Sequence, residues 1–368
     1  MKFIRDNIVK IALVFGILIV IVIVLIACSG GGTNAGKARS YSKIEDNFKS
    51  AATKFLSSHK DLLPSEEGKI VQIQMDTVYN EKQMKKIVSP DDETVRCDGY
   101  VNVSYKISGD EKKSYRIVPY IKCGDLYETE NLYTHILKNE NLVTELDGLY
   151  KIGNEYIYRG EKPNNYLMIG EKSYRILSMD EEGYIKIIND KRISYSSVWD
   201  DRYNVNTSKR DGINDYYVSR MRESLNEIYN SDEYISEDER NLFVKHDYCT
   251  GKRSLNNDRI DKFEECTTTI NEDYLYLPLL YDFYIVSSDS SCKTIYSASC
   301  VNYNYLYNYL PFYTNTGVRD DTYQVFNIDE TAYVSKGNRG KRIKYVAYLL
   351  DASYVSGNGT EDNPYIVK

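Results

Sequence analysis

The stretch LYKIGNEYIYRG (residues 149–160) sets the character of the longer part of the chain. Aromatic and branched residues flank a central Gly-Asn pair, as in two short strands joined by a tight turn. The same pattern returns in NYLMIG (165–170), SYRILSM (173–179) and YIKII (184–188), with glycine at the turns. These successive hairpins predict a β-rich region that begins near residue 146.

Helical patterns and irregular loops follow the hairpins. Residues 214–229 repeat apolar side chains at helical spacing, and SEDE (236–239) is a capping-box pattern that opens a shorter helix. Beyond Cys249 the chain is turn-rich, and it closes with strand-like segments at 342–350 and 365–367. We therefore predict a β-rich α+β domain with irregular loops over 146–368.

A smaller α+β domain is predicted for residues 41–145. Apolar side chains recur every three or four residues from Tyr41 to Leu56, which indicates a helix. Residues 100–107 and 115–123 alternate apolar with polar side chains around a polar turn at 108–113, which indicates a hairpin. Two domains also fit the length of 368 residues.

The N-terminus predicts where these domains reside. A cationic segment precedes an apolar run over 11–27, which is just long enough to cross a bilayer with its cationic flank in the cytoplasm. The run ends in LIAC (25–28) and then Ser-Gly-Gly-Gly, which resembles a bacterial lipobox. Residues 1–28 are thus either a lipoprotein signal lipidated at Cys28 or a single-pass membrane anchor. A Gly/Ser linker over 29–40 would follow, with the rest of the chain extracytoplasmic.

The six later cysteines are an even number, which fits disulfides outside the cytoplasm. Folding the 100–123 hairpin about its turn brings Cys97 opposite Cys123, and the other four cysteines bracket two short polar loops. Zinc is disfavoured because the chain contains no C-x-x-C motif and its three histidines are widely scattered. We expect the disulfides Cys97–Cys123, Cys249–Cys266 and Cys292–Cys300.

Composition and motifs restrict the function. A net charge of −7 argues against a nucleic-acid partner, which needs a basic face. No histidine lies in a motif with a nucleophile, so we expect a binding protein with no catalytic residue, cofactor or metal. The pair Asp200-Asp201 leaves a glycan hydrolase of the cell envelope as the alternative, because the spacing of two catalytic carboxylates cannot be read from a sequence.

Tyrosines are concentrated in CVNYNYLYNYLPFY (300–313). As a strand, residues 303–309 would project four tyrosine rings from one face, either into the core or toward a ligand. As a helical turn, Tyr303, Tyr307 and Leu310 would share a side instead. We interpret the segment mainly as scaffold, exposed in part at an edge, and residues 303–313 as the expected contact region for an envelope glycan or peptide. The candidate ligand-binding residues are Tyr303, Tyr305, Tyr307, Tyr309, Tyr313 and Trp199.

Several phrases resemble modules of uncharacterised anchored surface proteins of Gram-positive-type bacteria. They are CDGYV (97–101), PYIKCG (119–124), YIYRG (156–160), NNY (164–166), YRI (174–176), NYNYL (302–306) and GNGTEDNPY (357–365). More loosely, the C-terminal module is similar to compact folds of the C-type-lectin or formylglycine-generating kind. The resemblance implies a fold and no activity. The chain departs from it at PFY (311–313), where tryptophans are expected, and at KYV (344–346), where an Arg-Pro pair is expected.

Overall fold

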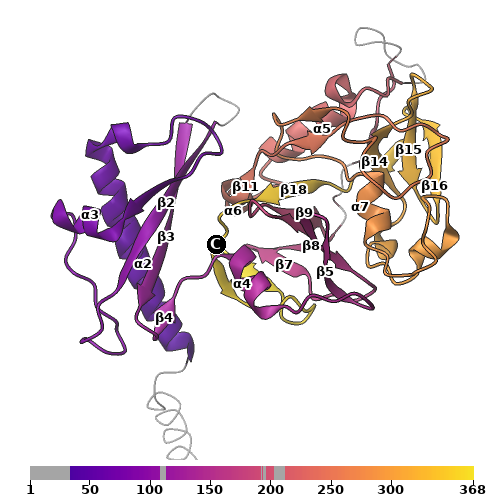
Figure 1. The fold of residues 1–368 in the computed structure, drawn as a ribbon. Coiled ribbons are helices and arrows are strands. Elements are labelled where there is room, and N and C mark those ends of the chain that lie inside the picture. The colour runs from indigo at the N-terminus through magenta and orange to yellow at the C-terminus, as the bar shows by residue number, and fades with distance from the viewer. Residues whose placement is uncertain (1–33, 108–112, 192, 194–195, 203–211) are drawn as a thin grey trace, which may run out of the picture. The chain divides into compact units, whose positions relative to one another are not determined.

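The computed structural model describes residues 34–107, 113–191, 193, 196–202 and 212–368 (Figure 1). The predicted anchor and Cys28 lie outside the described residues. Residues 34–40 of the predicted linker belong to a helix instead. Within the described ranges, no helix combines the length and the apolar character needed to span a membrane.

The fold is mixed α+β and rich in strands, as predicted. The described chain divides into two compact units. The smaller comprises residues 34–62, 72–101 and 119–128, and the larger comprises 63–71, 102–118 and 129–368, less the undescribed positions.

The N-terminal part contains the predicted helix and hairpin. Helix α2 (Asn34–Ser58) buries Phe48, Ala52 and Phe55, and the Tyr41 ring stacks on Tyr127 with centroids 4.0 Å apart. Among the described residues a four-stranded sheet has the order β1-β2-β3-β4. Its strands are β1 (Val71–Gln74), β2 (Asp98–Ile107), β3 (Lys113–Cys123) and β4 (Tyr127–Glu128), and the short helix α3 (Met75–Asn80) follows β1.

The larger unit is built on a sheet that contains the predicted hairpins. In the described part of the chain this sheet has nine strands in the order β11-β18-β9-β8-β7-β20-β19, with β6 joined to β8 and β5 joined to β6. Most neighbours are antiparallel, whereas β20 runs parallel to β7. The bounds are β5 (Gly148–Ile152), β6 (Glu155–Arg159), β7 (Tyr166–Ile169), β8 (Lys172–Asp180), β9 (Ile185–Asn189), β11 (Phe243–Val244), β18 (Val346–Leu349), β19 (Tyr354–Ser356) and β20 (Tyr365–Val367).

Helices and smaller sheets complete this unit. Figure 1 shows the main strands side by side, with α4 and the C-terminus near one end and the β14–β15–β16 sheet near the other. The remaining strands are β10 (Ser196–Val198), β12 (Tyr248–Cys249), β13 (Thr269–Ile270), β14 (Phe312–Gly317), β15 (Gln324–Ile328), β16 (Ala332–Lys336) and β17 (Gly340–Arg342). The helices are α4 (Leu132–Asn139), α5 (Arg220–Asn230), α6 (Glu237–Leu242) and α7 (Leu280–Ile285).

Residues 129–145, which the sequence assigns to the smaller domain, contribute to the larger unit. Leu132 and Ile136 of α4 are fully buried in the same core cluster as the strands of the main sheet. The cap of α6 is as predicted, because the Ser236 hydroxyl accepts from the Glu239 N–H and the Glu239 carboxylate accepts from the Ser236 N–H.

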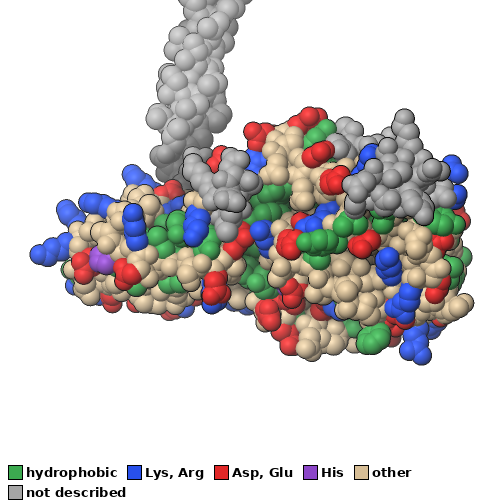
Figure 2. All heavy atoms as spheres, turned by 90° about the horizontal axis from the view of Figure 1, so that it is seen from above, with side chains coloured by type: hydrophobic (Ala, Val, Ile, Leu, Met, Phe, Trp, Pro, Cys, Tyr) green, Lys and Arg blue, Asp and Glu red, His purple; other side chains and the backbone are tan. Residues whose placement is uncertain are grey.

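The six cysteines after Cys28, all of them described, form the three predicted disulfides. Cys97–Cys123 joins the start of the hairpin to its end, and Cys249–Cys266 and Cys292–Cys300 each close a loop of the larger unit. Charged side chains of both signs are interspersed over the face seen in Figure 2, so neither sign forms a continuous patch there.

Candidate functional site

The tyrosine-rich segment 300–313 is not a strand. It passes through short 3-10 turns at Ala298–Val301 and Tyr307–Tyr309 before β14 begins at Phe312. The four tyrosines therefore share no face: Tyr303 and Tyr307 are 57% and 43% exposed, whereas Tyr305 is buried. Of the two alternatives, the strand is wrong. The helical turn in which Tyr303, Tyr307 and Leu310 share a side is closer to the structure, because Tyr303 and Tyr307 are both exposed.

Three of the six candidate ligand residues belong to the core. The Tyr305 ring centroid lies 4.6 Å from Arg175 Cζ, and burial raises the pKa of the Tyr305 hydroxyl. Tyr313 is fully buried, and so is Trp199, whose Nε1 donates to the Thr314 carbonyl at 3.0 Å. As these side chains stand, they cannot contact a ligand. Tyr309 is half-buried and donates its hydroxyl to Asp190.

The carboxylates suggested for a hydrolase have structural partners. Asp200 is fully buried, and its Oδ2 lies 2.7 Å from Arg202 Nη2. Its oxygens also accept from the backbone N–H groups of Arg202 and Arg220 at 2.7 and 3.0 Å. Asp201 pairs with the Arg220 guanidinium at 3.0 Å. Asp200 thus holds the backbone after β10 and does not face solvent, and Asp201 is held by a side-chain ion pair.

A cavity of about 90 Å³ lies on one face of the main sheet, and we call it the sheet-face cavity. Its floor is a register row across four strands, in which Ile157 faces Ser178, Ser178 faces Lys186 and Lys186 faces Tyr348. Helix α7, residues 246–249 and Lys262 of the Cys249–Cys266 loop line the rest. Three strands of the floor come from the predicted hairpins and the fourth is β18, and the disulfide loop supplies part of the opposite wall.

Lys186 crosses the cavity from floor to wall. Its Nζ lies 2.6 and 2.7 Å from the two carboxylate oxygens of Asp282 on α7, and both side chains are only 7% exposed. The same carboxylate accepts from the Leu279 N–H at 2.8 Å. The Lys186 ammonium also lies 4.9 Å from the Tyr248 ring centroid, within range of a cation–π contact. This pair joins α7 to the sheet.

His246 lies between two tyrosine rings at the side of the cavity. It stacks on Tyr348 and meets Tyr184 edge-on, with centroids 4.3 Å away in both cases. Its Nδ1–H donates to the Asp247 carbonyl at 2.8 Å, and its Nε2 lies 3.4 Å from Asp180 Oδ2. Burial acts to raise the pKa of Asp180, but hydrogen bonds from His246 and from backbone N–H groups lower it overall.

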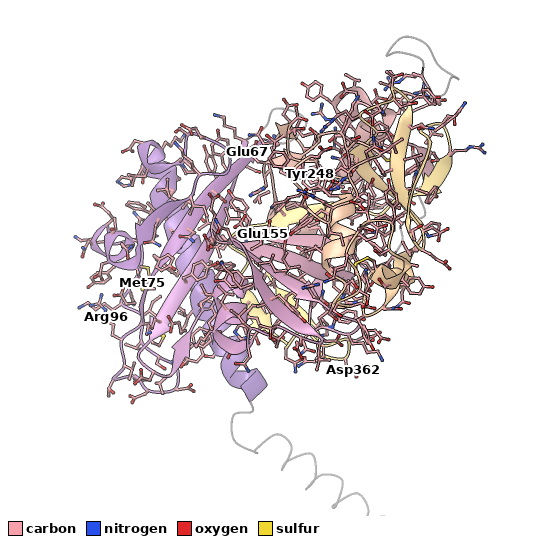
Figure 3. All side chains as sticks on the ribbon, turned by 45° about the vertical axis from the view of Figure 1, so that its right-hand side comes forward. Glu67, Met75, Arg96, Glu155, Tyr248 and Asp362 are labelled. Carbon is pink, nitrogen blue, oxygen red and sulfur yellow. A yellow bond between two sulfur atoms is a disulfide. The ribbon has the colours of Figure 1, made fainter. Side chains whose placement is uncertain are left out.

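The mouth of the cavity carries further carboxylates. Glu155 of β6 lies directly opposite Asp180 of β8 and pairs with Lys262, whose Nζ is 2.6 Å from Glu155 Oε1. The exposed carboxylate of Asp247 also lines the cavity. Glu155 on the sheet and Tyr248 on the overlying segment are labelled in Figure 3.

The chemistry of the sheet-face cavity suits binding. Four acidic residues and two lysines line it, and four tyrosine rings supply apolar walls with polar tips. Burial raises the pKa of Tyr184, Tyr281 and Tyr348, so their hydroxyls remain neutral donors at physiological pH. No three metal-ligating side chains gather anywhere in the part of the chain that the structure describes.

Sequence reasoning missed this site almost entirely. It placed Tyr184 and Lys186 only within a predicted strand and Cys249 only in a disulfide, and none of the six candidate ligand residues lines this cavity. The available signal was a lysine at position 186, inside an otherwise apolar strand, because a buried ammonium requires a buried acid. Comparison of the chain with family models, curated proteins and solved structures gave no match.

Proposed function

We propose that this chain is a membrane-anchored extracytoplasmic surface protein, and that residues 146–368 form a non-catalytic module that binds a component of the cell envelope. We further propose that this module is loosely C-type-lectin-like and that its contact site is the sheet-face cavity. The predicted contact region at 303–313 is replaced in this proposal, because half of the candidate residues are buried.

The disulfides support an exterior location. Three pairs formed from six cysteines fit an oxidising compartment, since cytosolic thiols are normally kept reduced. The apolar run over 11–27 and the cationic residues before it supply the corresponding anchor and orientation.

The observation that carries the proposal is the pairing of the cavity's charged groups. Lys186 holds Asp282, Lys262 holds Glu155, and His246 faces Asp180, so three of the acids already have a basic partner. A general acid or base must be able to exchange its proton with a substrate. Aromatic walls with fixed polar groups are instead the usual composition of a binding pocket.

The test uses full-length protein in detergent micelles and isolated cell-envelope fragments. We expect saturable retention on the fragments, a loss of retention in Tyr184→Ala, and unchanged retention in the control Tyr303→Ala/Tyr307→Ala. The control removes the two exposed tyrosines of the predicted contact region. Retention lost only in the control would return the site to residues 303–307.

The same incubation tests the hydrolase alternative. Release of reducing ends or soluble glycan over time, abolished by Asp200→Asn or Asp201→Asn, would contradict a non-catalytic role. We expect no such release, because Asp200 is enclosed and held by Arg202.

A further inference from the structure

We propose that the mouth of the sheet-face cavity binds a primary ammonium group, the side-chain amino group of an envelope peptide, at the position that Lys262 now occupies. This inference rests on the proposed function and names the ligand class of the same site. Its determinants are Glu155, Asp180, Tyr184, Tyr281 and the displaceable Lys262.

The first argument is the juxtaposition of two acids. Glu155 and Asp180 face each other across the β6–β8 pair, where like charges directly opposite are destabilising. Both side chains line the cavity, with the carboxylate of Asp247 beside them. Lys262 at Glu155 and His246 beside Asp180 now offset this repulsion, so a ligand that displaces Lys262 must bring a cation of its own, which a neutral sugar hydroxyl does not. The arrangement therefore selects a positively charged group.

The second argument is that the cavity already receives ammonium groups beside tyrosine rings. Lys186 Nζ lies 4.9 Å from the Tyr248 centroid, and Lys262 Nζ lies 5.9 Å from the Tyr281 centroid. Attraction between a cation and the ring quadrupole acts within about 6 Å. The Tyr184 ring extends the aromatic lining near Asp180.

The third argument distinguishes the two lysines. Lys186 is enclosed and holds both oxygens of Asp282, so it is a permanent part of the wall. The Lys262 side chain is 45% exposed and makes one ion pair, with Glu155. Exposed pairs of this kind contribute little stability. A ligand ammonium can therefore replace Lys262 at Glu155, and Lys262 acts as an internal competitor.

The experiment titrates full-length protein with n-pentylammonium and, separately, with neutral 1-pentanol of the same chain length, followed by saturation-transfer NMR. We expect n-pentylammonium to bind at least about tenfold more tightly than 1-pentanol, a difference of ~1.4 kcal/mol. Lys262→Met should tighten n-pentylammonium binding several-fold, and Glu155→Gln should weaken it about tenfold.

A matched pair outside the cavity controls for net charge. Lys151 Nζ lies 2.8 Å from Glu181 Oε1 and 4.0 Å from the Tyr156 ring centroid, which repeats the chemistry of Lys262 with two side chains that reach solvent. Lys151→Met and Glu181→Gln change the charge of the protein by the same amounts. Neither control should alter n-pentylammonium binding by more than about twofold.

Three results would overturn the inference: equal binding of n-pentylammonium and 1-pentanol, no tightening in Lys262→Met, or equal effects of Lys262→Met and Lys151→Met. A competition experiment, in which n-pentylammonium is added to protein retained on envelope fragments, then distinguishes this inference from the proposed function. Retention on envelope fragments that resists n-pentylammonium, or that glycan fragments alone displace, would reject the ammonium ligand and leave the binding function standing. Absence of any retention would reject the binding function itself.

Discussion

The position of the Lys186 side chain is set by one buried partner, Asp282. Its ammonium lies between both oxygens of Asp282, and neither group reaches much solvent. Such pairs add little net stability compared with apolar residues of the same size, but removing one partner leaves an uncompensated charge inside the protein. The pair therefore fixes where α7 lies over the sheet, and with it the shape of the sheet-face cavity.

Replacing Lys186 by methionine should be costly for this reason. We expect Lys186→Met to lower the free energy of unfolding by about 3–5 kcal/mol, measured by urea denaturation at neutral pH. The double variant Lys186→Met/Asp282→Asn should recover part of that loss, because no buried charge remains. A single variant as stable as the wild type would show that Asp282 is not enclosed.

Asp180 makes stability depend on pH. Its folded-state pKa is lowered, so it contributes stability above its unfolded pKa, and this contribution is lost as the pH falls through the folded pKa. Asp180→Asn retains an oxygen for the N–H groups of Glu182 and Tyr184. We expect its melting temperature to lie below that of the wild type at pH 6–7, with the gap closing below about pH 4. A difference in melting temperature that does not change with pH would assign the effect to packing.

Residue identity predicted some of these roles. The disulfides followed from short spacings and one hairpin, because loop closure is a local property. The roles of the tyrosines did not follow, because a tyrosine suits a buried or an exposed position equally well. Tyr305 and Tyr307 lie two residues apart, and only the first is buried.

At the scale of elements, one asparagine organises the tyrosine-rich segment. Asn304 is buried, and its Nδ2 donates to the carbonyls of Phe283 and Cys300, both at 2.9 Å. Its Oδ1 accepts from the Leu306 N–H at 2.9 Å. Tyr303, just before it, has a φ of 45°, in the left-handed region. These bonds favour a turn where alternating tyrosines predict a strand.

Asn304→Ala should therefore destabilise the fold. We expect a loss of about 2–3 kcal/mol in the free energy of unfolding, because the carbonyls of Phe283 and Cys300 lose a buried donor. Asn302→Ala is the matched control: the exposed Asn302 donates to Asp289 at 2.9 Å, and its loss should cost less than about 1 kcal/mol. Equal losses would mean that burial of Asn304 is not what holds the turn.

Hairpins were predictable, whereas the cavity was not. Strand alternation and glycine turns lie within a few residues of each other, so β5 to β9 could be located from the sequence. The floor of the cavity depends on the pairing of Lys186 with Tyr348, which are distant in the sequence. Its walls come from α7 and from a disulfide loop without regular strands. No local sequence pattern predicts that these distant segments form one cavity.

At the scale of the whole molecule, the proposed membrane anchor and the three disulfides imply the same location, outside the cytoplasm. If residues 1–28 hold the chain outside the membrane, as we propose, it enters a compartment where Cys97, Cys249 and Cys292 can oxidise with their partners. The sheet-face cavity would then meet envelope material directly, and Lys262, which belongs to the Cys249–Cys266 loop, would depend on that oxidation for its position.

The proposed location predicts the outcome of a labelling experiment on cells that make the protein. Intact, washed cells should lose the described units to an added protease. The chain denatured without reductant should gain no thiol label at its six later cysteines, and after reduction it should gain six labels by mass spectrometry. A seventh label, on Cys28, would select the transmembrane anchor over the lipoprotein, because a lipidated cysteine has no free thiol. Protection from the protease, together with six freely alkylated thiols, would place the chain inside the cell and remove the basis for an envelope ligand.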